Sequence, residues 1–307
     1  TTTASAPGKI MLSGEYAVLE GHVAVVAAID RRAVASFGTS PSESPLIRHI
    51  AAIVGETDPD AGQRARTITV DSSALYDAES KLGLGSSAAV AVAASSLALA
   101  SDEPKRVLPV AFEAHARTQA ERGARGSGAD IAAATYGGVV AVRPGGVQPV
   151  DVTGLSLPSN LELVCVWTGI PADTATLVSA VADAKADAPR RYQHAIASIA
   201  AASRELIDAL RTADAAACVD AIHHGADAHA ELGAATGVEL VIRAHQQIRA
   251  LAASRGGAAK PTGAGGGDVA LAAFAELEAA QTFRRDLELM GMKTLDLAVE
   301  PTGARLG

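Results

Sequence analysis

The sequence predicts an α+β fold of two domains, and three observations support this prediction. The chain has 307 residues, 49% of them hydrophobic and 20% charged, so it can bury more than one core. Short β-like runs alternate with glycine and proline in the first half, whereas long helical patterns dominate the second half. A stretch rich in glycine, proline and serine, Pro144 to Asn160, separates them. We therefore expect domains at residues 1–155 and 156–307, built from mixed sheets with helices packed on one face.

The first half reads as short strands followed by helices. Strands are predicted at Val23–Ile29, Ala33–Phe37, Thr67–Val70 and Val139–Val142, an exposed loop at Phe37–Pro45, and helices at Ala88–Ala100, Pro104–Glu121 and Ile131–Tyr136. The helix after Ser87 carries no charge and is shorter than the ~18 to 20 residues of a membrane span, so we interpret it as a core helix. Ser86 or Ser87 can cap its first turn.

The second half reads as one strand, four helices and a closing β-α-β pattern. Strands are predicted at Leu161–Trp167, Asp268–Phe274 and Thr294–Val299, and helices at Thr174–Lys185, Arg190–Arg211, Ala213–Leu232, Val238–Arg255 and Glu276–Met290. The four consecutive helices suggest one layer. A glycine loop, Gly263 to Gly267, precedes the second strand.

Charge and cysteine content narrow the classes of function. The net charge of −8 argues against a nucleic-acid groove, which needs a basic stripe. Cys165 and Cys218 are too few for a disulfide framework, and no leader-like pattern opens the sequence, so we expect a cytoplasmic protein without a membrane partner. Either a monomer or a homodimer is compatible with the sequence.

The stretch KLGLGSS, residues 81 to 87, raises the first question of chemistry. It is not a P-loop, which needs GxxxxGK[ST]. Glycines before a helix let a ligand approach the backbone, and the free N–H groups and dipole of the helix N-terminus attract anions such as phosphate. The alternative is a turn that merely caps a helix, and this stretch alone leaves the two interpretations evenly balanced.

Two further stretches favour the phosphate interpretation: PGKIMLSGEYAVLEG begins at Pro7, and KPTGAGGGDVALA begins at Lys260. With KLGLGSS between them, this order resembles the family of small-molecule kinases named for galactokinase, homoserine kinase, mevalonate kinase and phosphomevalonate kinase. The resemblance implies that the middle motif wraps the phosphates of ATP, in a cleft between the two domains. Backbone N–H groups would then replace the P-loop lysine. The chain has Glu79 and Ser80 where the family usually has proline and glycine.

Several local matches are typical of the phosphomevalonate kinase branch of this family. They are GEYAVLE from Gly14, Lys81 before GLGSS, His115 with Gln119, GSGAD from Gly126 to Asp130, WTGIPADT from Trp167 to Thr174, and GAGGGD from Gly263 to Asp268. Two positions depart from the pattern, because Ala129 replaces an aromatic residue and Asp173 replaces a serine.

The resemblance implies a role for individual residues. Lys9 and Asp130 would be catalytic, and Ser87 and Gln119 would hold Mg²⁺. ATP would be bound by Lys81, Gly83, Leu84, Gly85, Ser86, Ser87 and Ala88. The acceptor would be bound by Ser13, Glu15, Tyr16, Ser127, Gly128, Thr262, Gly263, Ala264 and Gly265. Arg122, Arg125, Arg190 and Arg191 are expected to face solvent, although guanidinium groups can also pair with an acidic substrate.

The implied activity is ATP- and Mg²⁺-dependent transfer of a phosphoryl group to a small phosphorylated substrate, 5-phosphomevalonate. One alternative is another enzyme of the same fold, a mevalonate kinase or a diphosphomevalonate decarboxylase-like enzyme that phosphorylates a hydroxyl. A second alternative is a non-catalytic ATP- or metabolite-binding module. The presence of both Lys9 and Asp130 argues against this second alternative.

Overall fold

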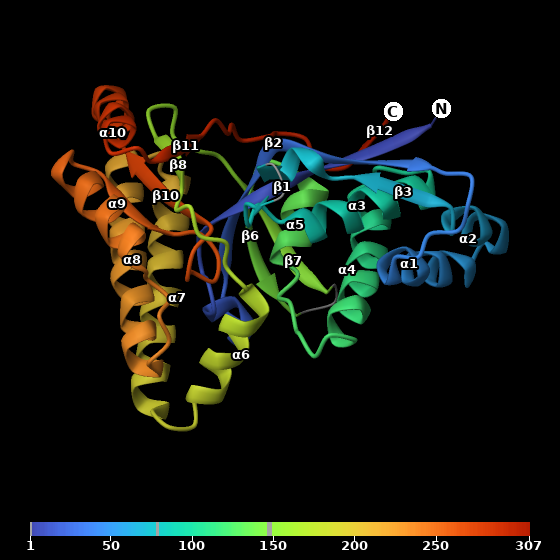
Figure 1. Ribbon diagram of the computed structural model, residues 1–307, viewed down its shortest axis with the longest axis horizontal. Helices are drawn as coiled ribbons and strands as arrows, with labels where there is room; N and C mark the ends of the chain where they lie inside the picture. Colours follow the sequence, from blue (N-terminus) through green and yellow to red (C-terminus); the bar gives the residue numbers. More distant parts are fainter. Residues whose placement is uncertain (1, 78–79, 146–148) are drawn as a thin grey trace.

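The computed structural model describes residues 2–77, 80–145 and 149–307. Two antiparallel sheets form its centre, one in each half of the chain, and helices flank them (Figure 1). Glu79, noted above, and residues 146–148 of the separating stretch lie outside the described residues.

The first half is built on a six-stranded sheet in the order β12-β1-β2-β6-β7, with β3 also paired to β2. The strands are β1 (Thr3–Ser13), β2 (Ala24–Phe37), β3 (Ile68–Asp71), β6 (Val139–Pro144), β7 (Val150–Leu155) and β12 (Arg305–Leu306). Every described pairing is antiparallel, so the expected mixed sheets are antiparallel sheets instead. Strand direction follows from the connections in space, which periodicity along the chain does not report.

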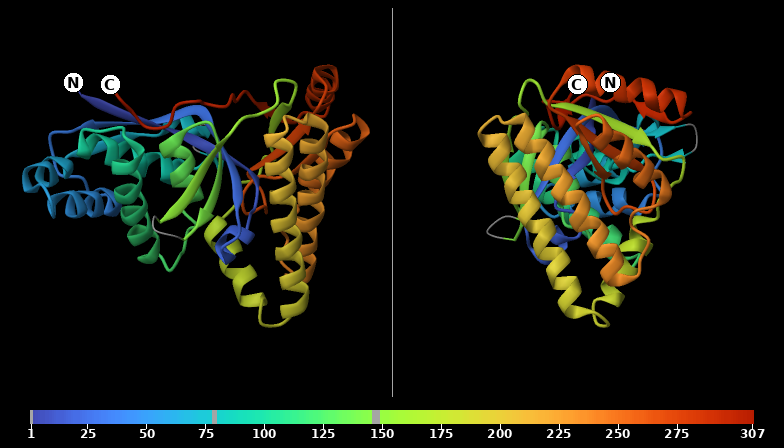
Figure 2. Two further views of the ribbon diagram at one scale, coloured as in Figure 1. Left: turned by 180° about the vertical axis from the view of Figure 1, so that it is seen from behind. Right: turned by 90° about the vertical axis from the view of Figure 1, so that its left-hand side faces the viewer.

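Helices cover one face of this first sheet, as predicted (Figure 2). They are α1 (Pro45–Gly55), α2 (Pro59–Ala65), α3 (Ser86–Leu99), α4 (Pro104–Ala120) and α5 (Ala129–Tyr136). Alternate strand residues such as Met11 and Val26 pack against them in one apolar core. The uncharged α3 lies at its centre and is buried on nearly all sides, which explains its lack of a polar face.

The second half is built on a four-stranded sheet in the order β11-β8-β10-β9. The strands are β8 (Glu162–Trp167), β9 (Ala258–Pro261), β10 (Val269–Phe274) and β11 (Lys293–Leu295), and the helices are α6 (Thr174–Ala184), α7 (Pro189–Arg211), α8 (Ala215–Thr236), α9 (Arg243–Ser254) and α10 (Leu277–Leu289). Here helices cover both faces, α9 and α10 on one and α7 and α8 on the other. The predicted single layer of four helices is therefore wrong, because α9 buries its apolar stripe on the opposite side of the sheet from α7 and α8.

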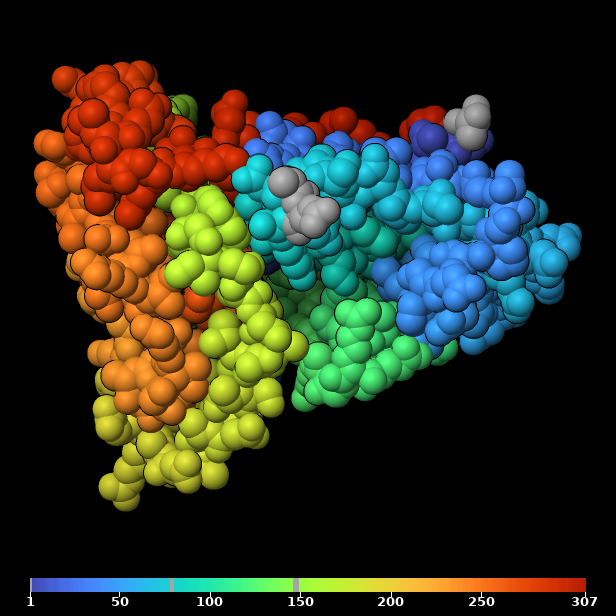
Figure 3. Space-filling view, viewed as in Figure 1, coloured from blue at the N-terminus to red at the C-terminus, as the bar shows by residue number. Residues whose placement is uncertain are grey.

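The two halves share a core. Ile10 and Leu12 of the first sheet, Leu206 of α7 and Leu271 of β10 belong to one buried apolar cluster. The helix α6 stands apart from this cluster, and Figure 3 shows the molecular surface hollowed between α6 and α4. The division at residue 155 stays a prediction.

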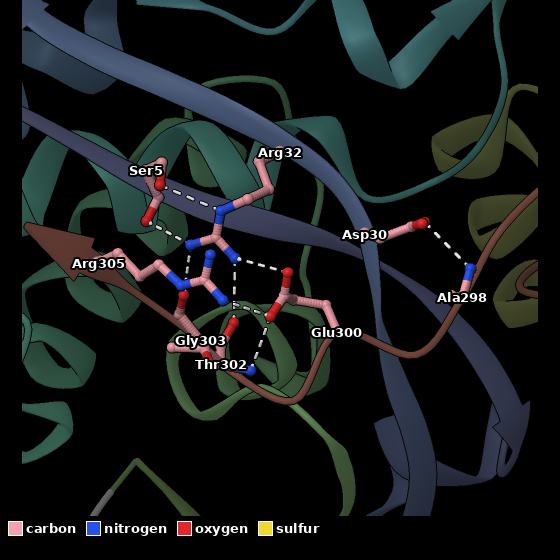
Figure 4. A network of polar contacts seen from close by, with 8 residues as sticks. All are labelled: Ser5, Asp30, Arg32, Ala298, Glu300, Thr302, Gly303 and Arg305. Atoms are coloured by element: carbon pink, nitrogen blue, oxygen red, sulfur yellow. Dashed lines mark hydrogen bonds and ion pairs between the residues drawn. The ribbon is translucent and has the colours of Figure 1, made fainter. Parts of the chain in front are cut away.

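The end of the chain returns to the first sheet, where a polar network fastens it (Figure 4). The guanidinium of Arg32 donates to the carbonyl oxygens of Ser5, Thr302 and Gly303. Glu300 accepts from Arg305 and lies 3.7 Å from Arg32. These bonds place β12 beside β1, an addition to the first sheet that no pattern near residue 305 predicts.

Several element predictions need correction. The two strands predicted within Val23–Phe37 are one long strand, β2, and β1, α1, α2, β7 and β9 lie where no element was predicted. A helix over 238–242 is wrong, because this segment is irregular and the Leu240 carbonyl accepts from Gly266 N at 2.8 Å. Within the described ranges no helix is long and apolar enough to span a membrane.

Candidate active site

Strand β1 and helix α5 bring the two predicted catalytic residues together. Lys9 Nζ lies 3.5 Å from Asp130 Oδ1. Lys9 is buried, whereas the Asp130 side chain is 40% exposed, so the pair opens toward solvent on the carboxylate side. Gly128 precedes α5 with a φ of 79°, a left-handed conformation that glycine adopts without strain. This turn places Asp130 in the first turn of α5, where the helix dipole favours a negative charge.

The glycine turn before α3 lies directly against Lys9. Lys9 N donates to Leu84 O at 2.8 Å. A Cβ added to Gly85 would lie 2.8 Å from Lys9 Cγ, so the lysine stem crosses the turn at a place where only glycine fits. Gly83 and Gly85 both have left-handed φ values, 72° and 76°. The geometry therefore joins the first and second motifs.

The N-terminus of α3 differs from the prediction. Gly85 is the N-cap, and among the described residues no side chain caps the helix, so the proposed caps Ser86 and Ser87 are wrong. The buried Ser86 hydroxyl lies 3.4 Å from Tyr76 Oη instead. Leu84 and Ala88 are buried, and these residues can meet a ligand chiefly through their backbone. The free backbone N–H groups of a helix N-terminus suit an anion, and ATP binding by this turn stays a prediction.

Ser87 and Gln119 are the residues predicted to hold Mg²⁺. Ser87 Oγ lies 3.0 Å from His115 Nε2 on α4, and Gln119 lies one turn further along that helix. Burial lowers the pKa of His115 below its usual value. The charge of Asp130 opposes this shift, and the charge of Lys81 adds a smaller lowering. The described residues contain no cluster of three histidine, cysteine, aspartate or glutamate side chains that could hold a metal. This donor set fits an ion that arrives with a nucleotide and keeps several waters, because Mg²⁺ binds few protein groups beside phosphates.

Buried contacts of the first motif hold the third motif in place. Glu15 forms a buried ion pair with Lys260, whose ammonium also donates to Pro261 O at 2.8 Å. Tyr16 Oη donates to Ala264 O at 2.7 Å, and Ser13 Oγ lies 2.9 Å from Ser203 Oγ of α7. In the structure these three side chains connect β1 and the residues after it to α7 and to the third motif. Their expected contacts with the acceptor stay predictions.

The third motif is fixed on several sides. Thr262 Oγ1 accepts from Met11 N at 2.8 Å and donates to Met11 O at 2.9 Å. Gly263 N lies 3.5 Å from Glu15 Oε1, and Gly265 packs so closely on Leu240 O that a Cβ would lie 2.2 Å from it. These contacts attach the loop of the third motif to β1 and to the residues that follow it.

The remaining predicted residues lie around this centre. Ser127 Oγ accepts from Ala129 N at 3.2 Å, which shapes the turn before α5. Lys81 is exposed on β5 (Ser80–Lys81). The hydrogen bonds from Thr176 lower the pKa of Asp173, and the charge of Lys81 adds a smaller effect in the same direction. Gln119 packs against Gly126, where a Cβ would lie 2.4 Å from its Oε1.

The arginines divide into two groups. Arg122 and Arg125 lie in the exposed segment between α4 and α5, beside the site. Arg190 and Arg191 line a small surface cavity with His194 and Glu231, and no residue of the three motifs lines that cavity. The second pair is therefore a poor candidate for an acceptor contact.

Comparisons with known proteins identify the family of this chain. A family model described as GHMP kinases N terminal domain matches residues 46–138. A mevalonate kinase from Aeropyrum pernix is 30% identical over 99% of this chain and 97% of its own length. The chain belongs to the GHMP kinase family. A phosphomevalonate kinase from a Streptomyces species is 29% identical, covering 89% of each chain.

Solved structures show that the whole chain has the GHMP kinase fold. A Lin0012 protein from Listeria innocua superimposes with a TM-score of 0.85 at 24% identity, covering 100% of this chain and 99% of that one. The phosphomevalonate kinase of Streptococcus pneumoniae, in complex with phosphomevalonate and AMPPNP, gives a TM-score of 0.82 at 19% identity, covering 97% and 99%. The predicted family and α+β fold are confirmed.

Sequence reasoning gave no role to three residues that the structure places in this GHMP kinase site. Lys260 is the buried partner of Glu15, His115 contacts Ser87, and Asp268 lies against Gly83. All three fall inside the matched motifs, so their positions were visible, but their partners lie far away along the chain.

Proposed function

We propose that this GHMP kinase transfers the γ-phosphoryl group of ATP to the phosphate of 5-phosphomevalonate, giving 5-diphosphomevalonate and ADP. The observation that carries this proposal is the position of Lys9, which crosses the glycine turn at Gly85 and lies 3.5 Å from Asp130. One place thus gathers a cation, a carboxylate and the N–H donors of a helix terminus. Phosphoryl transfer depends mainly on such positioning and charge stabilisation.

The nucleotide phosphates would lie along the turn Gly83–Ser87, with Lys81 at its entrance. Backbone N–H groups of α3 would receive the β and γ phosphates, and the glycines allow the close approach. Ser87 and Gln119 would hold Mg²⁺, which neutralises phosphate charge when it is bound. His115, buried and in contact with Ser87, would orient that hydroxyl.

Lys9 and Asp130 would act as a pair. Lys9 would stabilise the negative charge that shifts during transfer, because a fixed cation in a partly dry site is worth more than one in water. A phosphate acceptor has a second pKa near ~6 and is already mostly a dianion at pH 7, so no proton must leave. Asp130 would then orient Lys9, rather than act as a base.

The acceptor is inferred from the local motifs and the relatives. Six local matches favour the phosphomevalonate kinase branch, and one relative of that name aligns over 89% of the chain. The Streptococcus pneumoniae phosphomevalonate kinase, which has this fold, binds phosphomevalonate and AMPPNP. A mevalonate kinase is the second candidate, because the relative of that name aligns over 99% of the chain. With mevalonate, Asp130 would have to accept a hydroxyl proton.

An acceptor panel tests the proposal. Purified protein with ATP and Mg²⁺ is offered mevalonate, 5-phosphomevalonate and 5-diphosphomevalonate in turn, and ADP release is followed by a coupled assay. Lys9→Met serves as the control for contaminating kinases. The proposal requires turnover with 5-phosphomevalonate that exceeds turnover with the other two acceptors. Turnover with mevalonate alone would support the second candidate, and tight ATP binding without any transfer would support a non-catalytic module.

We further propose that catalysis takes place between residues 1–155 and 156–307, near the hollow beside α6. A cytoplasmic location, a monomer or homodimer, and the absence of nucleic-acid partners remain part of this proposal. Sedimentation of the purified protein would test the oligomeric state.

A further inference from the structure

Asp268 is a buried carboxylate for which the proposed reaction has no task. It ends the third motif and directly precedes β10, and it is 9% exposed. Its backbone has a φ of 53°, in the left-handed region. Aspartate, asparagine and glycine tolerate this conformation better than other residues do. A non-glycine residue keeps such a conformation only where the surrounding structure fixes it.

Four hydrogen bonds join Asp268 to the turn that follows β8. Asp268 N donates to Ile170 O at 2.7 Å, and Asp268 O accepts from Thr168 N at 3.0 Å and from Thr168 Oγ1 at 2.8 Å. The carboxylate itself takes part, because Oδ1 accepts from Ala172 N at 2.9 Å. The turn 168–173 leads into α6, which Asp173 caps by accepting from Thr176 N.

The other face of the same carboxylate meets the nucleotide loop. A Cβ added to Gly83 would lie 2.4 Å from Asp268 Oδ2, so the carboxylate packs directly on the backbone of this glycine. Burial raises the pKa of Asp268, whereas the charges of Lys81 and Lys9 lower it. The side chain therefore lies between the second motif and the turn before α6, within the field of both lysines.

Neighbouring glycines allow this close packing. A Cβ on Gly267 would lie 2.4 Å from Ile170 O, and one on Gly266 would lie 2.7 Å from Leu177 Cδ1 of α6. The third motif thus packs on both the turn and the first part of α6. Asp268 is the residue of that motif that also reaches Gly83.

We propose that Asp268 is a positioning residue that holds the turn 168–173, and with it the start of α6, against the Gly83 loop. Its task is to set the acceptor side of the site at a fixed position relative to the nucleotide side. This inference rests on the proposed function, because it takes α6 as an element of the acceptor-binding side of the site. Asp268 acts through Ala172 and Gly83, and touches neither substrate.

Three variants separate the parts of this task. Asp268→Asn keeps the oxygen that accepts from Ala172 and tolerates the left-handed backbone. Asp268→Gly keeps the backbone conformation and removes the acceptor oxygen, and Asp268→Ala also adds backbone strain. Asp30→Gly is the matched control, because Asp30 Oδ1 also accepts from a backbone N–H, that of Ala298 at 3.1 Å, and neither residue belongs to the three motifs (Figure 4).

Steady-state kinetics and nucleotide binding give the first measurement. We expect Asp268→Gly to raise the KM for the acceptor about tenfold or more, equivalent to about 1.4 kcal/mol. The Kd for ATP without acceptor should stay within about threefold of wild type, and Asp268→Asn should restore the acceptor KM to within about threefold. Asp30→Gly should change neither. An unchanged acceptor KM in Asp268→Gly would overturn the proposal, as would an equal loss in Asp268→Asn.

Amide hydrogen exchange gives a second measurement that needs no turnover. Asp268→Gly should speed exchange in the turn 168–173 and at the start of α6, with no change in β1 or α3. Unaltered exchange there, or faster exchange spread over the whole chain, would overturn the proposal. Absence of turnover with every acceptor would refute the proposed function instead, and the exchange experiment would still decide the role of Asp268.

Discussion

Loss of one partner of the buried Glu15–Lys260 pair should destabilise the protein strongly. Both side chains are at most 3% exposed, and the lysine has one further acceptor, Pro261 O. Glu15→Gln leaves the Lys260 ammonium buried without a counter-charge. Removal of one member of such a pair costs about 3 to 5 kcal/mol. Since domains are typically stable by about 5 to 15 kcal/mol, this is a large fraction of the whole.

Urea unfolding followed by circular dichroism measures this effect. The midpoint for Glu15→Gln should fall with an unchanged m-value, because the unfolded chain exposes the same surface. Glu15→Gln combined with Lys260→Met should recover much of the loss, since no buried charge is left unpaired. The exposed pair of Glu113 and Arg117 on α4 is the matched control, and Glu113→Gln should cost no more than about 0.5 kcal/mol.

Two results would refute this reasoning. One is a loss below about 1 kcal/mol in Glu15→Gln, which is the range of an exposed pair. The other is a double variant that is less stable than both single variants, since the buried charges would then not depend on each other. A loss of about 3 to 5 kcal/mol in Glu15→Gln would also show that the first and third motifs stabilise each other through this ion pair.

Three further predictions concern catalysis and pH. Ser87→Ala should lower activity more at limiting than at saturating Mg²⁺, and an unchanged Mg²⁺ dependence would remove Ser87 from the metal site. With 5-phosphomevalonate as acceptor, Lys9→Met should lower kcat by about 10²- to 10³-fold, and Asp130→Asn should lower it by less. Asp130 would instead be a base if Asp130→Asn lost more activity than Lys9→Met and if an acid-side pKa of the wild-type rate between pH 6 and 9 disappeared in this variant. Burial and Lys260 lower the pKa of His229 from 6.5 to about 3. Below pH 6.5 this histidine is therefore protonated in the unfolded chain but still neutral in the folded chain. The free energy of unfolding should accordingly fall as the pH drops below 6.5. His229→Gln should flatten the unfolding free energy between pH 7 and 5 by on the order of 2 kcal/mol, and an unaltered slope would contradict this sign.

The sequence by itself determined the family and predicted much of the local chemistry. Three glycine-containing motifs in a fixed order predicted a helix terminus for phosphate, and periodicity placed most of the helices. The resemblance implied that Lys9 and Asp130 are catalytic, but only the structure shows that they lie side by side, because residues 121 positions apart carry no local signal of contact. Local patterns report burial and turns, and both are properties of short segments.

Tertiary structure decided what the motif residues do to one another. The resemblance implied acceptor contacts for Glu15 and Tyr16, and only the structure shows that both are buried against the third motif, at Lys260 and Ala264. The sequence suggested Ser86 or Ser87 as the cap of α3, whereas Gly85 is the N-cap and the stem of Lys9 packs against it. The closing strand β12 joined the first sheet from the end of the chain. The physical reason is common to these cases: contacts between distant segments depend on which faces the sheets bury together, and a linear pattern does not record that arrangement.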